Sequence, residues 1–421
     1  MPNTYLERNT LYPPLIGSNP EWGLTLVVTI PCFDEPDLLS TLSSLGRCST
    51  PPMQAEVIVV VNNAAGAPRE IVGRNNNTYQ EALAWAEDHS RQDLQFEILY
   101  LSELPPRHAG VGLARKIAMD EAARRLVAAE NPSGIITCLD ADSRVQANYL
   151  QAVCRYFDEH PGCPAANIHY EHPLEGRDFA PEIYEAIVLY ELHLRYYVHA
   201  LRRAGLRAAT QTVGSAMAVR ADAYMAQGGM NRRQAGEDFY FLHKFTPMSG
   251  FGTITTTTVT PSPRPSHRVP FGTGKVIGQM IEGQPFLSYA PQIFDDLHVF
   301  LGQPERWYGP ADFSEAELVK AVRILPDSVR SFLQQQDFSA KLRELRQHSG
   351  SAETFVKRFF RWFDPFLAMK YVHHARDRYY PGVPVETAVR AFLQWPTDKG
   401  TAREMLAVFR DMDRREETDT G

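Results

Sequence analysis

The sequence predicts an α/β protein built on a mostly parallel sheet, with a helical region toward its C-terminal end. Short apolar runs rich in β-branched residues alternate with helical segments through the first 160 residues, as in repeated βαβ units. After about residue 285 these runs give way to helices with apolar and basic residues at helical spacing. We therefore expect one α/β domain over residues 1–285 and a mainly helical region of unassigned role over residues 286–421.

The composition is that of an ordinary globular protein, and it argues against nucleic-acid-binding and membrane-spanning proteins. The 421 residues are 44% hydrophobic and 22% charged. A formal net charge of -7 argues against nucleic acid as a partner. No apolar run reaches the roughly 18 residues of a transmembrane segment, and the N-terminus lacks a secretory pattern. Five cysteines without C-x-x-C spacing fit reduced thiols. We expect a cytoplasmic protein, at most peripheral at the inner face of the membrane.

The predicted elements follow one another in a regular order. Pro31 ends the first strand, three consecutive asparagines mark a loop, and a glycine-rich turn opens the third helix. We expect strands at residues 24–30, 55–61, 96–101, 135–140, 165–170 and 253–260. We expect helices at residues 34–45, 79–89, 110–129, 148–159, 181–204, 236–245, 314–325 and 353–380. A glycine-containing strand or turn is expected at 211–219, and a proline-rich loop at 261–270.

The strand at residues 135–140 ends in two carboxylates one residue apart, Asp140 and Asp142. A chain that leaves a parallel sheet at this end enters the crevice where open α/β sheets bind ligands. Two hard oxygen ligands without an adjacent cysteine or histidine suit Mg²⁺ or Mn²⁺ held between the protein and a diphosphate. The other interpretation is a turn or helix N-cap at Asp142 or Ser143. This stretch alone leaves both interpretations open.

Six segments between residues 24 and 244 occur in an informative order. They are TIPCFDEPDLLSTLSSL, VIVVVNN, GVGLARKIAMDEA, LDADS, VGSAMAVRADAY and GEDFYFLHK. Each alone is a weak signal, but in this order and spacing they resemble the family-2 glycosyltransferases with a GT-A fold. The resemblance implies a Rossmann-like sheet and a hexosyltransferase-like enzyme. Such an enzyme moves a sugar from a nucleotide-diphosphate donor to an acceptor hydroxyl, with inversion at the anomeric carbon.

The resemblance implies a nucleoside pocket at the ends of the first two strands. The matching residues are Pro31, Cys32, Phe33, Glu35 and Asn62. The family often has an aspartate at the position of Asn62, where it hydrogen-bonds the base, so the sequence leaves the donor as a UDP- or GDP-sugar. A turn residue is the alternative interpretation of Asn62.

Small residues and a basic side chain are expected near the sugar. Residues 110–115 open a helix whose N-terminus favours an anionic group, and Arg115 or Lys116 is expected to reach the diphosphate or the sugar. Gly214 and Ser215 match the small-residue turn that lines the sugar or acceptor site in the family. An ordinary glycine-rich helix start and close packing of strand on helix are the alternatives.

The resemblance also implies a metal site and a loop over the diphosphate. Asp140 is expected to touch the ribose or sugar and Asp142 to bind Mn²⁺ or Mg²⁺ more directly. In the proline-rich loop, His267 is the candidate third metal ligand, and Arg264 and Arg268 are candidates to hold phosphates. An exposed proline-rich linker is the alternative.

An acid pair follows a flexible glycine loop. Inverting transfer needs a base that accepts the acceptor hydroxyl's proton. The family position matches Asp238, so we expect Asp238 to be the base and Glu237 to orient it or the acceptor. The alternative is two acids that stabilise a helix N-terminus.

Two further patterns are given less weight. Residues 303–307 match the Q-x-x-R-W motif of processive polysaccharide synthases, but those enzymes carry transmembrane helices, so a packing role is preferred. The aromatic and basic stretch at residues 355–380 could lie on a membrane and meet a lipid-linked acceptor, although packing on the catalytic domain is commoner.

The leading hypothesis is therefore a metal-dependent inverting glycosyltransferase acting on a glycan, lipid-linked or small-molecule acceptor. The alternative is a catalytically inactive GT-A domain that binds nucleotides or glycans as a scaffold, for which the asparagine at position 62 is the only argument. A nucleotidyltransferase ranks last, because the loop after the first strand, PCFDEP, lacks the expected glycines and lysine.

Overall fold

The computed structural model describes residues 4–49, 54–266, 268, 272–308, 320, 322–396 and 399–415. The chain divides into two compact units, and each is built from separate segments. The sheet unit comprises Met1–Tyr184, Thr212–Gly278 and Arg410–Gly421, and the helical unit comprises Glu185–Gln211 and Gln279–Phe409. The predicted division into domains near residue 285 stays a prediction.

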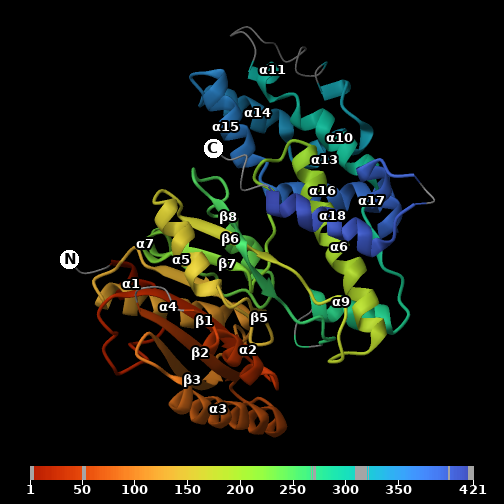
Figure 1. Cartoon of the computed structure of the whole chain (residues 1–421). Coiled ribbons are helices and arrows are strands. Elements are labelled where there is room, and N and C mark those ends of the chain that lie inside the picture. The colour runs from red at the N-terminus through yellow and green to blue at the C-terminus, as the bar shows by residue number, and fades with distance from the viewer. Residues whose placement is uncertain are drawn as a thin grey trace. The chain divides into compact units, whose positions relative to one another are not determined.

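The described strands and helices are shown in Figure 1. The strands are β1 (Leu24–Cys32), β2 (Gln54–Ala64), β3 (Leu94–Leu104), β4 (Ile135–Cys138), β5 (Arg144–Val145), β6 (Ala165–Tyr170), β7 (Met217–Arg220), β8 (Gly252–Thr260), β9 (Leu287–Ser288) and β10 (Val383–Pro384). The helices are α1 (Thr4–Arg8), α2 (Leu38–Gly46), α3 (Arg69–His89), α4 (Val111–Ala128), α5 (Tyr149–Glu159), α6 (Pro181–Arg203), α7 (Ala221–Ala226), α8 (Glu237–Leu242), α9 (Thr273–Ile281), α10 (Pro291–Leu301), α11 (Pro304–Tyr308), α13 (Asp327–Gln335), α14 (Phe338–Gln347), α15 (Ala352–Trp362), α16 (Pro365–Arg378), α17 (Val385–Leu393) and α18 (Ala402–Arg415).

The main sheet has eight strands among the described residues, in the order β3-β2-β1-β4-β7-β6-β8-β5. The first four are parallel neighbours, and β6 and β8 also pair in parallel. Strand β7 runs antiparallel to both β4 and β6, and β5 runs antiparallel to β8. The predicted class, an α/β fold with a mostly parallel sheet, flanking helices and a helical C-terminal region, is confirmed.

Both faces of the sheet are buried, which explains the continuous apolar runs. Every residue of β1 except Thr25 is buried. Leu26, Val28 and Ile30 join a core that includes residues of α2, α3 and α5. Leu24 and Val27 join a second core, which includes residues of α1, α4, α7 and α8. A strand covered on both faces needs apolar side chains at successive positions, as parallel strands commonly show.

The helix predicted at residues 79–89 is wrong at its start, because α3 begins at Arg69 and includes the asparagines assigned to a loop. Asparagine has a low helix propensity. Asn75 is nevertheless tolerated in α3, because its fully buried side chain makes tertiary hydrogen bonds. Its Oδ1 accepts from the Asp34 amide at 2.8 Å, and its Nδ2 donates to the Asn62 carbonyl at 3.0 Å.

The helical unit has an aromatic core. Trp307, from the Q-x-x-R-W match, is 1% exposed, and its ring centroid lies 5.2 Å from that of Phe338 and 5.4 Å from that of Phe300. This tryptophan packs in the core, as the preferred interpretation expects. The predicted helix at 314–325 lies largely outside the described residues.

The aromatic stretch at residues 355–380 is split into α15 and α16, so the single helix predicted there is wrong. The first helix ends at Trp362 with Phe363 as its C-cap. Asp364 caps the second helix, since its Oδ1 accepts from the Leu367 amide at 2.8 Å, and Pro365 follows at the first helical position. Phe355 and Phe359 are buried, so this aromatic face packs inside the unit. No described helix is long and apolar enough to cross a membrane.

Candidate functional site

The predicted carboxylates lie where β4 ends beside β1. The Leu139 amide still donates to the Thr29 carbonyl at 3.0 Å, after which the chain leaves the sheet. The Ser143 amide then donates to the Asp140 carbonyl at 3.0 Å, closing a turn. Thr41 Oγ1 in α2 donates to the Ala141 carbonyl at 2.9 Å and ties this turn to the helix after β1. Asp140 and Asp142 are therefore presented at the carboxyl end of the parallel strands.

Arg115 joins this turn to the acid pair. Its side chain in α4 is buried, Nη2 donates to Asp140 Oδ1, and Nη1 donates to Glu237 Oε1. Gly214 makes room for the guanidinium, since a Cβ at that position would lie 2.9 Å from both terminal nitrogens. The ion pairs with Glu237 and Asp140 raise the pKa of Arg115, although burial opposes them. Arg115 is therefore an internal bridge between the two acidic motifs.

The acid pair begins α8, after Gly236 in the left-handed region with φ 70°. Glu237 is buried against Arg115, whereas Asp238 is partly exposed and its Oδ1 accepts from the Phe239 amide at 2.7 Å. Burial raises the pKa of Asp238 to about 7, and the charge of Glu237 adds to this effect. A carboxyl group with such a pKa exchanges a proton near neutral pH, which suits general-base chemistry.

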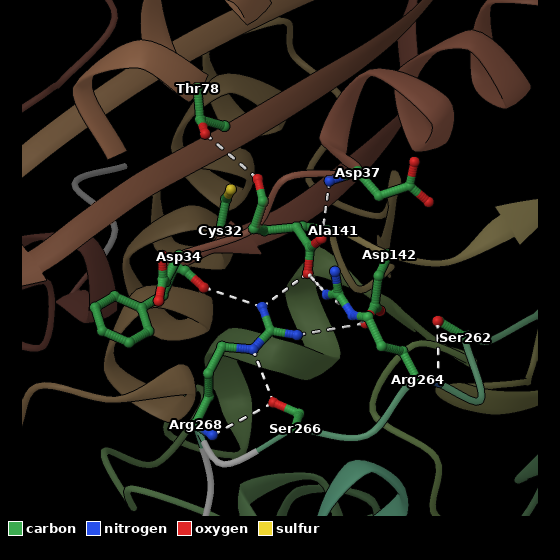
Figure 2. A network of polar contacts seen from close by, with 12 residues as sticks. Cys32, Asp34, Asp37, Thr78, Ala141, Asp142, Ser262, Arg264, Ser266 and Arg268 are labelled. Carbon is green, nitrogen blue, oxygen red and sulfur yellow. Dashed lines mark hydrogen bonds and ion pairs between the residues drawn. The ribbon is translucent and has the colours of Figure 1, made fainter. Parts of the chain in front are cut away.

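Two arginines also contact Asp142, and both of them pair with the carboxylate of Glu35. We call Arg264 and Arg268 the arginine pair; Figure 2 shows both side chains converging on Asp142. Arg264 Nη2 lies 2.5 Å from Glu35 Oε2, and Arg268 Nη1 lies 2.7 Å from the same oxygen. Asp142 Oδ2 lies 3.7 Å from Arg264 Nη2 and 3.5 Å from Arg268 Nη2.

The carboxylates of Asp140 and Asp142 are too few to hold a divalent cation alone, but they suit a cation whose remaining ligands are water and phosphate oxygens. Among the described residues, no three His, Cys, Asp or Glu side chains are grouped as a metal site. Mg²⁺ commonly takes one or two carboxylates and completes its shell with water and substrate phosphates. Asp140 and Asp142 could supply those two carboxylates. His267, the predicted third ligand, lies outside the described residues.

Burial raises the pKa of Asp142 to about 7, and the charges of Asp140 and Glu35 add to this effect. The arginine pair acts in the opposite direction. Asp142 thus has both carboxylate and guanidinium groups as electrostatic neighbours.

The predicted nucleoside pocket residues lie together at the ends of β1 and β2, with several polar groups already engaged. Asn62 is buried, and its Nδ2 donates to the Cys32 carbonyl at 2.9 Å. Pro31 is buried in β1, whereas Phe33 is partly exposed and its carbonyl accepts from Arg268. The side-chain amide of Asn62 therefore holds the end of β2 to the end of β1.

Ser215, predicted to line the sugar site, is fully buried, and its Oγ makes no hydrogen bond with the described residues. It follows Gly214, whose Cα faces the Arg115 guanidinium. The start of α4 is closely covered too, since a Cβ on Gly112 would lie 2.1 Å from the Arg233 carbonyl oxygen. Both glycine segments are thus closely packed against neighbouring residues, and their expected roles at the sugar and the diphosphate stay predictions.

Sequence reasoning missed the ion pair and helix that shape the turn after β1. Asp34 adopts φ 50° and pairs with Arg74 of α3 at 2.6 Å. The hydrogen bond from Arg74 lowers the pKa of Asp34. Aspartate tolerates the left-handed region better than most residues, and the D-E-P sequence was the available signal. The partner was hidden by the asparagine run beside it.

Comparison with known proteins identifies the family. The model of glycosyl transferase family group 2 matches residues 135–367, more than half of the chain. The chain belongs to this family. It is a glycosyltransferase, as the six segments predicted, and the predicted GT-A class agrees with the sheet described above. No curated protein matches the chain.

Crystal structures of TarS from S. aureus are distant structural relatives of this glycosyltransferase. TarS 1–349 in complex with UDP-GlcNAc is 14% identical, with 80% of this chain and 92% of that chain covered and a TM-score of 0.41. TarS 1–349 in complex with UDP is 13% identical, with 81% and 92% covered and a TM-score of 0.39. The family assignment rests on the match over residues 135–367.

Proposed function

We propose that this glycosyltransferase moves a sugar from a UDP- or GDP-sugar to an acceptor hydroxyl with inversion, using Asp238 as the base. The observation that carries the proposal is Arg115, which ion-pairs with both Asp140 and Glu237. This residue places the carboxylates expected to face the donor beside the acid pair expected to face the acceptor. One-step transfer needs both groups around a single anomeric carbon.

On the donor side, the diphosphate would lie between the arginine pair and the aspartates. Arg264 and Arg268 each expose about a quarter of the side chain, so both can donate to phosphate oxygens. Asp140 and Asp142 would hold Mn²⁺ or Mg²⁺, which when bound stabilises the negative charge of the leaving nucleoside diphosphate. Glu35 and Asn62 would hold the loop and the strand ends on which the nucleoside rests.

On the acceptor side, Asp238 would take the hydroxyl proton as the oxygen attacks the anomeric carbon. Its pKa of about 7 leaves a large ionised fraction at neutral pH and makes it a stronger base than an ordinary aspartate. Glu237, fixed by Arg115, would keep Asp238 in place and maintain its raised pKa. The acceptor is proposed only by class, as a glycan, a lipid-linked sugar or a small molecule with a free hydroxyl.

The cytoplasm is the proposed location, with peripheral contact to a membrane if the acceptor is lipid-linked. All five cysteines are unpaired and buried, which is what a reducing compartment favours.

The first experiment is calorimetric titration of the full chain with UDP and GDP, each with Mn²⁺ and again with EDTA. Metal-dependent binding of one nucleotide is expected and would identify the base of the donor. Binding of neither nucleotide by a folded protein would contradict the proposed donor class. With the donor identified, NMR of the product should show an anomeric configuration opposite to that of the donor; retention would contradict the one-step mechanism.

The Asp238→Asn variant tests the base. The amide keeps the size of the side chain but accepts no proton, so we expect transfer to fall at least a hundredfold, within the usual range of general-base contributions. Nucleotide affinity by calorimetry should stay within about twofold, because Asp238 does not face the diphosphate in this proposal. Wild-type transfer by the variant would exclude Asp238 as the base.

A further inference from the structure

The arginine pair brings two positive charges close to the Asp142 carboxylate. Its two guanidinium groups and the carboxylates of Glu35 and Asp142 form a cluster without net formal charge. Both guanidiniums approach the same Asp142 oxygen, at 3.5 and 3.7 Å. A divalent cation bound to that oxygen would therefore have two positive groups close by, and like charges at such separations repel strongly where water is partly excluded.

Glu35 fixes the pair from the other side. The side chain is 2% exposed, Oε1 accepts from the Asp37 amide at 2.9 Å, and Oε2 accepts from both arginines. Ser266 adds a hydrogen bond of 3.0 Å from Arg268 Nε. Figure 2 shows the contact between Ser266 and Arg268. Both oxygens of Glu35 thus already have hydrogen-bond partners within the protein.

The two ends of Arg268 make different contacts. Nη1 donates to Glu35 and to the Phe33 carbonyl at 2.7 and 3.0 Å, whereas Nη2 lies 3.5 Å from Asp142, too far for a good hydrogen bond. A phosphate oxygen could therefore replace Asp142 at Nη2 without disturbing the Glu35 end. The planar fork of arginine suits such a divided role.

We propose that, in the ligand-free enzyme, the arginine pair occupies the place of the divalent cation at Asp142, and that a nucleotide diphosphate takes over the pair and so opens Asp142 to the cation. Glu35 is the positioning residue that keeps both arginines at the site throughout. This inference rests on the proposed function, because it assumes a diphosphate donor. Its consequence is an order of binding: the cation alone binds weakly, and nucleotide and cation strengthen each other's binding by the same factor.

The test measures Mn²⁺ binding by the electron paramagnetic resonance signal of free Mn²⁺, with the full chain and without nucleotide. Removing both competing charges in Arg264→Gln/Arg268→Gln should tighten Mn²⁺ binding roughly tenfold, a value reduced from the buried limit because the site is partly exposed. Arg264→Lys/Arg268→Lys keeps the charges and should bind Mn²⁺ as weakly as wild type. Arg330→Gln, which removes an exposed arginine paired with Asp327, is the matched control and should change nothing.

A triple variant locates the effect. Adding Asp142→Asn to Arg264→Gln/Arg268→Gln should abolish the gain in Mn²⁺ affinity, because the proposed carboxylate is gone. A gain that persists without Asp142 would overturn the inference, and so would unchanged Mn²⁺ affinity in a folded double-glutamine variant. Thermal unfolding followed by circular dichroism checks folding in each case.

The second arm adds the nucleotide identified by calorimetry. In wild type, saturating nucleotide should tighten Mn²⁺ binding by tenfold or more, and in the double-glutamine variant this factor should shrink to about threefold or less. An equal factor in both proteins overturns this inference and leaves the proposed function standing. Failure of wild type to bind any nucleotide, by contrast, overturns the proposed donor and the takeover by diphosphate together.

Discussion

At the scale of single residues, the proposed base Asp238 and its neighbour Glu237 lead to a prediction about the pH dependence of transfer. Asp238 faces Glu237, Arg115 and Asp140; burial and the two carboxylates raise its pKa, and Arg115 lowers it. Because the base form is the ionised one, kcat/KM should rise with pH and level off above about 7.

Glu237→Gln tests this coupling. The substitution removes a neighbouring negative charge while keeping the shape of the side chain, so the pKa of Asp238 should fall and the rising limb should move to lower pH. The profile of kcat/KM between pH 5 and 9 measures the shift. A limb that stays in place, or moves to higher pH, would contradict the assignment of the limb to Asp238 beside Glu237.

Asp238 is also expected to lower the stability of the folded chain, because its carboxyl group is held where ionisation is unfavourable. Its pKa lies near 7 in the folded chain and near 3.8 in an ordinary aspartate, so between these values the folded state binds the proton more tightly. The free energy of unfolding attributed to this residue therefore falls as pH rises from about 4 to 7. Asp238→Asn should be more stable than wild type at pH 8 by about 1–3 kcal/mol, with no difference near pH 4.

Urea denaturation followed by circular dichroism at both pH values measures this difference. Asp222→Asn is a suitable control, because Asp222 lies on α7 at the surface. An equal gain at pH 4 and pH 8 would show that the amide stabilises the chain for another reason than charge.

The acidic residues of the site were predictable and their partners were not. The motifs LDADS and GEDFYFLHK single out Asp140, Asp142 and Asp238 as candidate site residues. Arg115 was expected to face the donor, yet the structure buries it between Asp140 and Glu237. Its partner Glu237 lies 122 positions away in the sequence, and no local pattern encodes a contact over that separation.

At the scale of elements, hydrogen bonds connect the N-terminal helix α1 to α4, the helix that carries Arg115. Tyr5 Oη donates to Asp120 Oδ1 at 2.8 Å and accepts from Lys116 Nζ at 3.0 Å. Tyr224 Oη donates to the same Asp120 oxygen at 2.6 Å. Lys116, adjacent to Arg115, is thus buried and paired with Asp120.

Tyr5→Phe should cost about 1–2 kcal/mol of stability, because it removes one buried hydroxyl from two hydrogen bonds and leaves Lys116 paired with Asp120. Tyr79→Phe is the matched control: the ring stacks on Tyr100 at 5.4 Å, and its loss of a hydroxyl should cost less than about 0.5 kcal/mol. Urea denaturation compares the two. Equal costs would mean that the Tyr5 hydroxyl adds nothing to the fastening of α1.

Element boundaries failed where a tertiary contact overrides a local preference. The strand at residues 165–170 was predicted to the residue, since its ends are marked by proline and by polar residues. The start of α3 was missed because buried hydrogen bonds of Asn75 offset its poor helix propensity. The break before α16 had a readable signal in Asp364-Pro365, but the continuous aromatic pattern obscured it.

At the scale of the whole molecule, the alternation of strands and helices gave the sheet and its parallel half. The antiparallel strand β7 between β4 and β6 was not predictable, because strand order depends on pairing across distant segments. The division into two compact units was not predictable either. Residues 185–211 form one unit with residues 279–409, and no local pattern in the sequence encodes contacts between such distant segments. Every described candidate site residue, by contrast, lies in the sheet unit.

This placement predicts where a bound nucleotide should protect the chain. The proposed donor contacts come from the ends of β1 and β4, from α4 and from residues 264–268. Saturating nucleotide with Mn²⁺, at about a hundred times its dissociation constant, stabilises the binding-competent state by about 2.7 kcal/mol. Segments that exchange only when the site opens should then exchange roughly a hundredfold more slowly, because the opened state binds no nucleotide.

Hydrogen exchange followed by mass spectrometry measures this effect peptide by peptide. We expect slowing in peptides that cover residues 26–35 and 135–145, and unchanged exchange in α13 and α16 of the helical unit. The Asp142→Ala chain under the same conditions is the control and should show little slowing, because its cation-dependent affinity is lost. Protection confined to α13 and α16 would place the nucleotide in the helical unit and remove Asp140 and Asp142 as its contacts.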